Sequence, residues 1–218
     1  MTTTPQLPLK PLNKPAIEQL AERVDELRAE ARKKDTPELL AVNSGATCLI
    51  KKGTAEIQLS LFGRQVRIPF PELMAGDMQT GDPLPVSTQA LLLYYLNTAD
   101  GTPLEGRWVA FASLPGGRFY AQAFQGYSGD ELAGHFGNNL EKFEQAARKL
   151  DGMSITYGDV GFVFYALPRV MLAVVAYRGD EDFPPSYRIL FDASASHYLP
   201  VDVCAILGSM LTHKLLAV

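Results

Sequence analysis

The chain has 218 residues, a hydrophobic fraction of 47%, a charged fraction of 20% and a formal net charge of −4 at pH 7. This composition is that of an ordinary globular protein, with enough apolar side chains for one substantial core or two small ones. A nucleic-acid-binding domain usually carries a basic face. Here the basic cluster at 28–34 shares a predicted helix with acidic residues at 18–30, so it is interpreted as a solvated face. The sequence therefore predicts no nucleic-acid binding.

The N-terminal residues 1–14 are rich in Pro and Thr and lack the apolar core of a secretory signal, so a flexible arm is expected. The longest apolar runs, such as 170–177, are too short to span a bilayer.

The two cysteines, Cys48 and Cys204, lie in apolar surroundings and are expected to behave as small buried hydrophobes. No CxxC or Cys/His metal spacing is present, so no self-contained iron–sulfur motif or structural zinc site is predicted. A reducing cytoplasm fits these thiols best.

Residues 15–40 are predicted as an N-terminal amphipathic helical segment. Ile17, Leu20, Val24 and Leu27 recur at helical spacing, with charged residues between them. This apolar stripe needs a partner, either the sheet of the same domain or another chain. The segment is therefore a candidate docking element for a partner protein.

Residues 41–218 are predicted as a single α+β domain. Alternating apolar residues over 54–70 predict an antiparallel hairpin with its turn near Gly63, and 46–51 are a candidate third strand. A helix is expected over 86–97, and its run over 91–96 is apolar nearly all round, which indicates a buried helix. A second hairpin is expected over 106–124, with its turn at Pro115-Gly116-Gly117.

Two short helices are expected over 128–136 and 139–150, and strands over 154–157, 160–166, 170–177 and 187–192. A last helix is expected over 201–216. Because no repeated βαβ rhythm appears, the predicted fold is α+β, with a mainly antiparallel sheet built from hairpins and packed with several helices.

Five segments carry a family resemblance: LLYYL at 92–96, GRWVAFASLPGGR at 106–118, LPR at 167–169, DEDFP at 180–184 and LFD at 190–192. In this order they resemble DUF3786, an uncharacterised family from anaerobic bacteria and archaea. The resemblance covers roughly 45–216. Some family members carry an additional cysteine-rich iron–sulfur segment of a kind also found in corrinoid proteins, and this chain lacks it. The resemblance thus implies an association with corrinoid or one-carbon metabolism, and it supplies no agreed catalytic residues.

The acidic turn at 180–182 is a candidate cation site. Asp180 and Asp182 offer carboxylate oxygens, and Asp192 and His197 add ligands if the strand brings them beside the turn, a mixed set that suits a divalent metal. The alternative is a solvated hairpin turn, with Asp192 capping a local turn. His197 is either a ligand or general base, or a packed histidine near the start of the last helix. A nucleophile at Ser194 is not favoured, because no Gly-x-Ser-x-Gly elbow surrounds it.

The Pro-Gly-Gly loop lacks the Lys-Ser/Thr pair of a phosphate loop, so a tight turn explains its glycines. Arg118 could clamp a carboxylate or phosphate in a cleft with Trp108 and Tyr120. The many aromatic residues could line a pocket for a flat cofactor such as a tetrapyrrole, or could form plain core.

The function predicted from the sequence is a binding or accessory module, and the family resemblance implies that it acts beside redox or corrinoid enzymes. The alternative is a small metal-dependent enzyme centred on Asp180, Asp182, Asp192 and His197. The sequence leaves open whether the chain is an enzyme and which ligand it binds.

Overall fold

The computed structural model describes residues 14–51 and 53–218. The predicted arm over 1–14 therefore lies outside the described residues except for Lys14. The chain forms two compact units. The first contains the described residues up to Pro103, with Leu167–Arg169 and His197–Val203, and the second contains Leu104–Ala166, Val170–Ser196 and Cys204–Val218. The sequence predicts the span 41–218 as one domain, and both compact units contain parts of this span. That 41–218 is a single domain stays a prediction.

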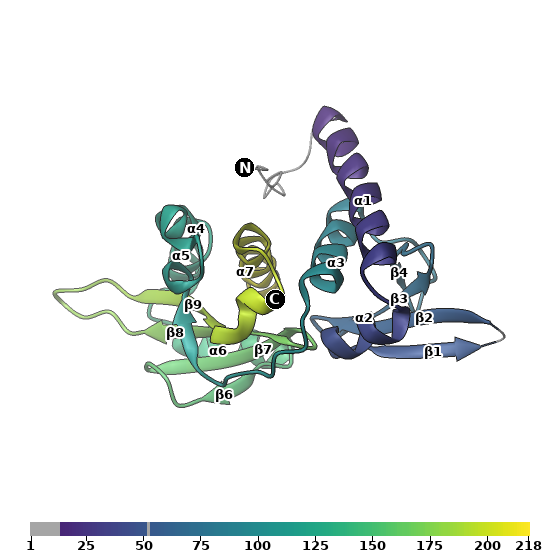
Figure 1. Ribbon diagram of the computed structural model, residues 1–218. Coiled ribbons are helices and arrows are strands. Elements are labelled where there is room, and N and C mark those ends of the chain that lie inside the picture. The colour runs from purple at the N-terminus through teal and green to yellow at the C-terminus, as the bar shows by residue number, and fades with distance from the viewer. Residues whose placement is uncertain (1–13, 52) are drawn as a thin grey trace. The chain divides into compact units, whose positions relative to one another are not determined.

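The first unit contains an antiparallel sheet in the order β1-β2-β3-β4 (Figure 1). Its strands are β1 (Thr47–Lys51), β2 (Thr54–Leu61), β3 (Arg64–Phe70) and β4 (Gly76–Asp77). Strands β2 and β3 pair in register, with Leu61 opposite Arg64 across the two-residue turn at Phe62-Gly63. This confirms the hairpin predicted from the alternating pattern. Ile57 and Ile68 face each other in that register and are both buried.

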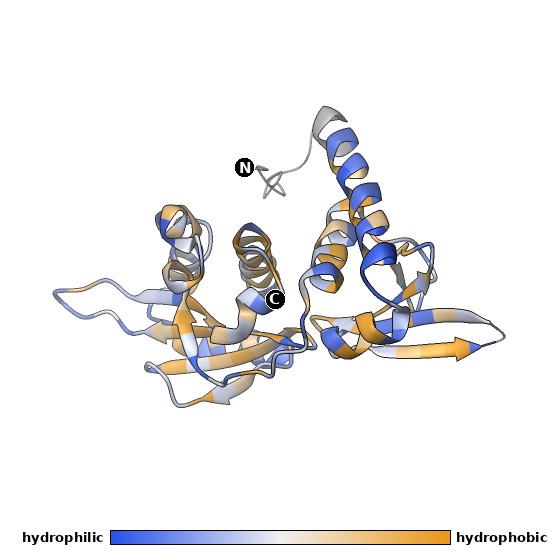
Figure 2. Ribbon diagram, viewed as in Figure 1, coloured by the Kyte–Doolittle hydropathy of each residue, from blue (hydrophilic) through white to orange (hydrophobic). Residues whose placement is uncertain are grey.

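Three helices accompany this sheet: α1 (Lys14–Lys34), α2 (Pro37–Ser44) and α3 (Val86–Thr98). Helix α1 packs against α3, and its buried stripe includes Leu20, Val24 and Leu27 (Figure 2). The Arg23 guanidinium donates to the Tyr94 hydroxyl at 3.1 Å, and the Asn97 amide donates to the Leu27 carbonyl at 2.9 Å. The apolar stripe of α1 is therefore covered by α3 of the same chain. A partner protein that binds α1 stays a prediction, and it would contact the charged outer face of the helix.

The second unit contains a sheet in the order β5-β9-β8-β7-β6. The pairs β5–β9, β8–β9 and β6–β7 are antiparallel. The strands are β5 (Trp108–Ala110), β6 (Met153–Ile155), β7 (Val160–Leu167), β8 (Val170–Tyr177) and β9 (Ser186–Asp192). The α+β class and the mainly antiparallel pairing are confirmed.

The helices that follow β5 are α4 (Ala121–Gly126), α5 (Gly129–Phe136), α6 (Leu140–Lys149) and α7 (Val201–Leu216), with 3-10 turns η1 (Phe111–Ser113), η2 (Gly117–Phe119) and η3 (Ala193–His197). Aromatic rings join α6 to the sheet. Phe143 packs edge-on against Phe162 and Tyr187, with ring centroids 5.9 and 5.3 Å apart. Burial of these large rings supplies much of the stability of this unit.

The hairpin expected over 106–124 is wrong. The only strand in this segment is β5, and it pairs with β9, which follows much later in the chain. The chain then turns back through η1 and η2, so closely that a Cβ on Gly117 would lie 1.9 Å from the Phe111 carbonyl oxygen. The rings of Phe111 and Phe124 stack at 4.3 Å. This aromatic contact and the long-range pairing with β9 outweigh the local hairpin pattern.

Substitution of Gly117 tests this compact turn. The Gly117→Ala chain should lose roughly 1–3 kcal/mol in free energy of unfolding, because the methyl group must displace backbone. Gly134 in α5 is the matched control, since a Cβ there meets nothing within 4 Å. Gly134→Ala should gain roughly 0.5–1 kcal/mol. Urea unfolding of both variants measures these changes, and equal midpoints for the two would contradict the close approach at Gly117.

Candidate functional site

Asp192 is the most highly bonded of the predicted site residues. Its side chain is fully buried at the end of β9. One carboxylate oxygen accepts from the Glu105 N–H at 3.1 Å, the Ser194 N–H at 3.0 Å and the Ser194 hydroxyl at 2.6 Å. The other accepts from the Gly106 N–H at 2.7 Å. Asp192 thus joins the segment entering β5 to the segment leaving β9.

The charge on Asp192 is stabilised by these donors. Burial by itself raises the pKa of a carboxyl group, but the bonds from Ser194, Glu105 and Gly106 outweigh burial and hold the pKa of Asp192 below its usual range. Gly106 has a φ of 67°, in the left-handed region that suits glycine, and this conformation aims its N–H at the carboxylate. A carboxylate whose oxygens both serve the backbone is a structural anchor.

The Ser194 hydroxyl donates its hydrogen to Asp192. Ser194 is itself buried. A serine nucleophile needs its hydroxyl bonded to a base that accepts the proton, usually a histidine. The observed bond instead uses Ser194 to hold Asp192.

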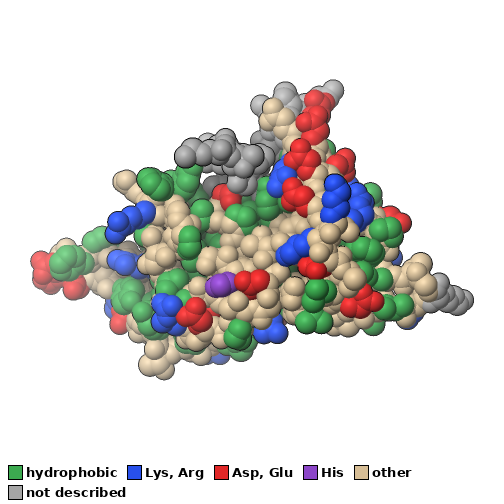
Figure 3. Space-filling view, viewed as in Figure 1, with side chains coloured by type: hydrophobic (Ala, Val, Ile, Leu, Met, Phe, Trp, Pro, Cys, Tyr) green, Lys and Arg blue, Asp and Glu red, His purple; other side chains and the backbone are tan. Residues whose placement is uncertain are grey.

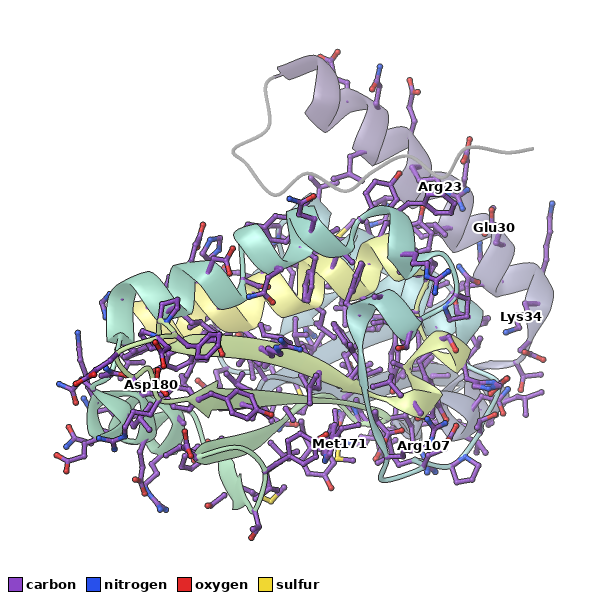
Figure 4. The ribbon with its side chains drawn as sticks, turned by 90° about the vertical axis from the view of Figure 1, so that its left-hand side faces the viewer. Arg23, Glu30, Lys34, Arg107, Met171 and Asp180 are labelled. Carbon is purple, nitrogen blue, oxygen red and sulfur yellow. The ribbon has the colours of Figure 1, made fainter. Side chains whose placement is uncertain are left out.

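Asp180 organises the turn between β8 and β9 (Figure 4). One of its carboxylate oxygens accepts from the Asp182 N–H at 2.9 Å and the Phe183 N–H at 2.8 Å. The Asp180 N–H in turn donates to the Phe183 carbonyl at 2.8 Å. These contacts are those of an Asx turn, in which a short carboxylate replaces a backbone acceptor. The side chain of Asp182 is exposed.

His197 pairs with a residue that the sequence analysis did not single out. Its Nδ1 lies 2.7 Å from a carboxylate oxygen of Asp100 and 3.2 Å from the Thr102 hydroxyl. The Thr102 N–H also donates to Asp100, at 2.9 Å. This arrangement orients the imidazole through Nδ1. His197 and Asp100 are 44% and 49% exposed, so the pair lies at the surface of the first unit.

Asp100 is held in its ionised form. Its bond with His197 is the largest cause, followed by the bonds from Thr102, and together they lower the pKa of Asp100 to about 2. The pair is 97 positions apart in the chain, so neither helical nor strand periodicity links the two residues. The one local feature of the sequence that points to this site is the Asp100-Gly101-Thr102 turn after α3.

The structure does not assemble a metal site from the predicted ligands. Within residues 14–51 and 53–218, no group of three or more His, Cys, Asp or Glu side chains could hold a metal ion. Asp180, Asp192 and His197 are each bonded to nearby donors or acceptors instead. These contacts keep the three residues in separate roles.

The predicted ligand-clamp residues have different environments. Trp108 is half-buried and packs against an apolar cluster that includes Met171 and Leu190. Arg118 and Tyr120 belong to the exposed surface of the η2 turn, with Phe119 between them at 89% exposure. Of the other aromatic residues proposed as a cofactor lining, Phe111, Phe124, Phe162 and Phe164 are buried. Their burial fits the alternative in which they form plain core.

Tyr95 joins two of the segments that carry the family resemblance. Its hydroxyl donates to the Ser44 carbonyl and accepts from the Arg169 N–H at 3.0 Å. The residue is fully buried, and burial raises the pKa of its hydroxyl. The LLYYL and LPR segments are thus brought together within the first unit.

Removal of the Asp192 carboxylate should be costly. We expect Asp192→Ala to lose roughly 3–5 kcal/mol in free energy of unfolding, because three N–H groups and a hydroxyl lose their acceptor. Ser194→Ala should lose about 1 kcal/mol. Asp182→Ala, at an exposed carboxylate of the same region, should stay within about 0.5 kcal/mol of the parent. Chemical denaturation measures all three, and a stable Asp192→Ala chain would argue against the anchor.

The Asp100–His197 pair predicts a pH dependence. A carboxyl with a lowered pKa stabilises the fold above its ordinary pKa, and this contribution disappears as the pH falls through the folded-state value. The loss should run from about pH 4 to about pH 2. In His197→Ala the pKa of Asp100 should rise toward the ordinary value, while Asp77, lowered by its own bonds to Thr80 and Arg64, stays unchanged. Carbon-13 NMR of the carboxyl groups measures both, and an unmoved Asp100 would refute the pairing.

Comparison with known proteins identifies a family model that matches residues 36–214, described as a domain of unknown function, DUF3786. The match begins before the region expected from the sequence and takes in α2. No curated protein and no solved structure matches the chain. None of the helices in the described part of the chain is long and apolar enough to cross a membrane. Since the family model spans most of its length, the chain belongs to the DUF3786 family.

Proposed function

We propose that the chain is a non-catalytic binding module whose partner surface is centred on Phe119. The observation that carries this proposal is the 89% exposure of the Phe119 side chain. Arg118 precedes it and Tyr120, at 46% exposure, follows it. Aromatic and arginine side chains dominate the energetics of protein interfaces, so three such residues in succession favour a binding surface.

The backbone that carries these side chains is well ordered by hydrogen bonds. The Leu114 N–H donates to the Phe111 carbonyl, the Gly117 N–H to Leu114, and the Tyr120 N–H to Gly117, at 3.1, 2.8 and 3.1 Å. A fixed backbone loses little conformational entropy on binding. The turn would therefore present Phe119 to a partner with little reorganisation.

The chemistry of the polar residues also favours binding over catalysis. Asp192 and Asp180 are engaged with backbone N–H groups, and Ser194 with Asp192. The alternative function, a small metal-dependent enzyme, gains no specific support from these contacts. The class of partner we propose, a redox or corrinoid protein in a reducing cytoplasm, rests on the family resemblance and on the absence of Cys/His metal-binding spacing around the two cysteines of the sequence.

Affinity purification from the native host tests the proposed surface. Phe119→Ala should leave the free energy of unfolding within about 0.5 kcal/mol of the parent. It should reduce the recovery of specific co-purifying proteins by about tenfold or more. Tyr165→Ala is the control, because Tyr165 is also an exposed aromatic residue, at 50%.

Quantitative mass spectrometry of the purified material reads out the result. Loss of the same proteins from the Phe119→Ala sample alone would support the proposal. An unchanged set of proteins in that sample, or no specific protein with the parent chain, would overturn it.

A further inference from the structure

The turn between β8 and β9 presents an aromatic side chain among carboxylates. Phe183 is 70% exposed, and Glu181 and Asp182 beside it are also exposed. We call residues 180–184 the acidic tip. On the face shown in Figure 3, acidic and hydrophobic side chains gather where this hairpin projects from its sheet. A phenylalanine side chain exposed at a projecting turn is accessible to a hollow on another surface.

The backbone of the acidic tip is held by hydrogen bonds at its base and to its first residue. Asp180 fixes its first residues by accepting from the Asp182 and Phe183 N–H groups. At its base, the Gly179 N–H donates to the Asn138 side chain at 2.7 Å. These bonds hold the backbone that carries Phe183, so docking of the tip needs little further ordering.

The first unit offers a hollow of complementary chemistry. It has a volume of about 480 Å³ and lies where α1 ends and α2 begins. We call it the basic hollow; it is lined by Arg32, Lys33, Lys34, Asp35, Thr36, Pro37, Leu39 and Phe70. Its apolar lining includes Leu39, which is 44% exposed. A hollow of this volume is within the range that accepts small ligands and single side chains.

The cations of this hollow are partly fixed in place. Arg32 donates to the Pro71 carbonyl at 3.1 Å, and Lys34 donates to the Asn97 carbonyl at 2.7 Å. Neither bond neutralises the positive charge. Among the described ion pairs, none joins Arg32, Lys33 or Lys34 to a carboxylate. With three cations and one carboxylate, Asp35, the lining carries an excess of positive charge.

We propose that the acidic tip of one copy of this chain docks in the basic hollow of a second copy. Phe183 would contact the apolar lining formed by Leu39 and Phe70, while the carboxylates of the tip face the cationic rim. Opposite charges on two such surfaces speed encounter and fix orientation. The proposal is independent of the Phe119 surface and fails or succeeds separately.

The buried area of this contact determines its strength, and the difference between its two surfaces determines its symmetry. A single turn in a single hollow buries less than the roughly 1,200 Å² of a stable interface, so the association is weak and concentration-dependent. The tip and the hollow are different surfaces, so the contact is heterologous. If each of two copies places its acidic tip in the basic hollow of the other, a closed dimer forms. If each copy instead docks in the hollow of a further copy, an open chain forms.

Analytical ultracentrifugation of the full chain over a concentration series tests the proposal. Self-association should be present at low ionic strength and weaken steeply as salt rises from about 0.01 M to about 1 M, over which the screening length falls from about 30 Å to about 3 Å. Phe183→Ala and Lys33→Glu should each weaken it about tenfold or more. The matched controls, Tyr165→Ala and Lys149→Glu, change exposed residues elsewhere and should behave as the parent.

A mixing experiment separates this contact from other modes of association. Phe183→Ala retains an intact hollow and Lys33→Glu retains an intact tip. A mixture of the two variants should therefore form a complex that neither forms alone. A parent chain that stays monomeric at all concentrations in low salt, or variants that associate as the parent does, would overturn the proposal. A mixture that remains monomeric would overturn it as well.

Discussion

The second unit depends on the carboxylate of Asp192. Four donors from Glu105, Gly106 and Ser194 converge on it, so the strand that enters the sheet at β5 is tied to the strand that leaves it at β9. This tie fixes Trp108 opposite Asp192. It also leaves Phe191, the neighbour of Asp192, to pack against Phe111 and Phe124. A buried charge is tolerated here because its hydrogen bonds replace the water that it lost.

The same use of carboxylates recurs in the loops. Asp180 accepts from two N–H groups in the β8–β9 turn, and Asp77 accepts from the Gln79 and Thr80 N–H groups at 2.6 and 2.9 Å. Each carboxylate serves residues two or three positions later in the chain. This local bonding accounts for the position of both carboxylates in their turns. The β8–β9 turn held by Asp180 also carries the exposed side chain of Phe183.

Local patterns in the sequence predict much of this fold and little of its polar contacts. The alternation over 54–70 predicts β2 and β3, and the apolar run over 91–96 predicts a buried α3, because each pattern reports one element and its buried face. Local patterns do not predict the conformation of residues 106–124, because it depends on pairing with β9 and on the close approach of Gly117 to Phe111. The Asp100–His197 pair is similarly hidden, because only the folded chain brings residues 97 positions apart together.

Because the carboxylates of Asp180 and Asp192 already accept from backbone N–H groups, we expect that they do not bind a metal ion. A crystal structure of the chain grown with Mn²⁺ tests this claim most directly, because anomalous scattering locates the ion. The account predicts no anomalous peak within coordination distance of Asp180, Asp182, Asp192 or His197, with the Glu105, Gly106 and Ser194 N–H groups still bonded to Asp192. A peak shared by two or more of those four side chains would contradict it.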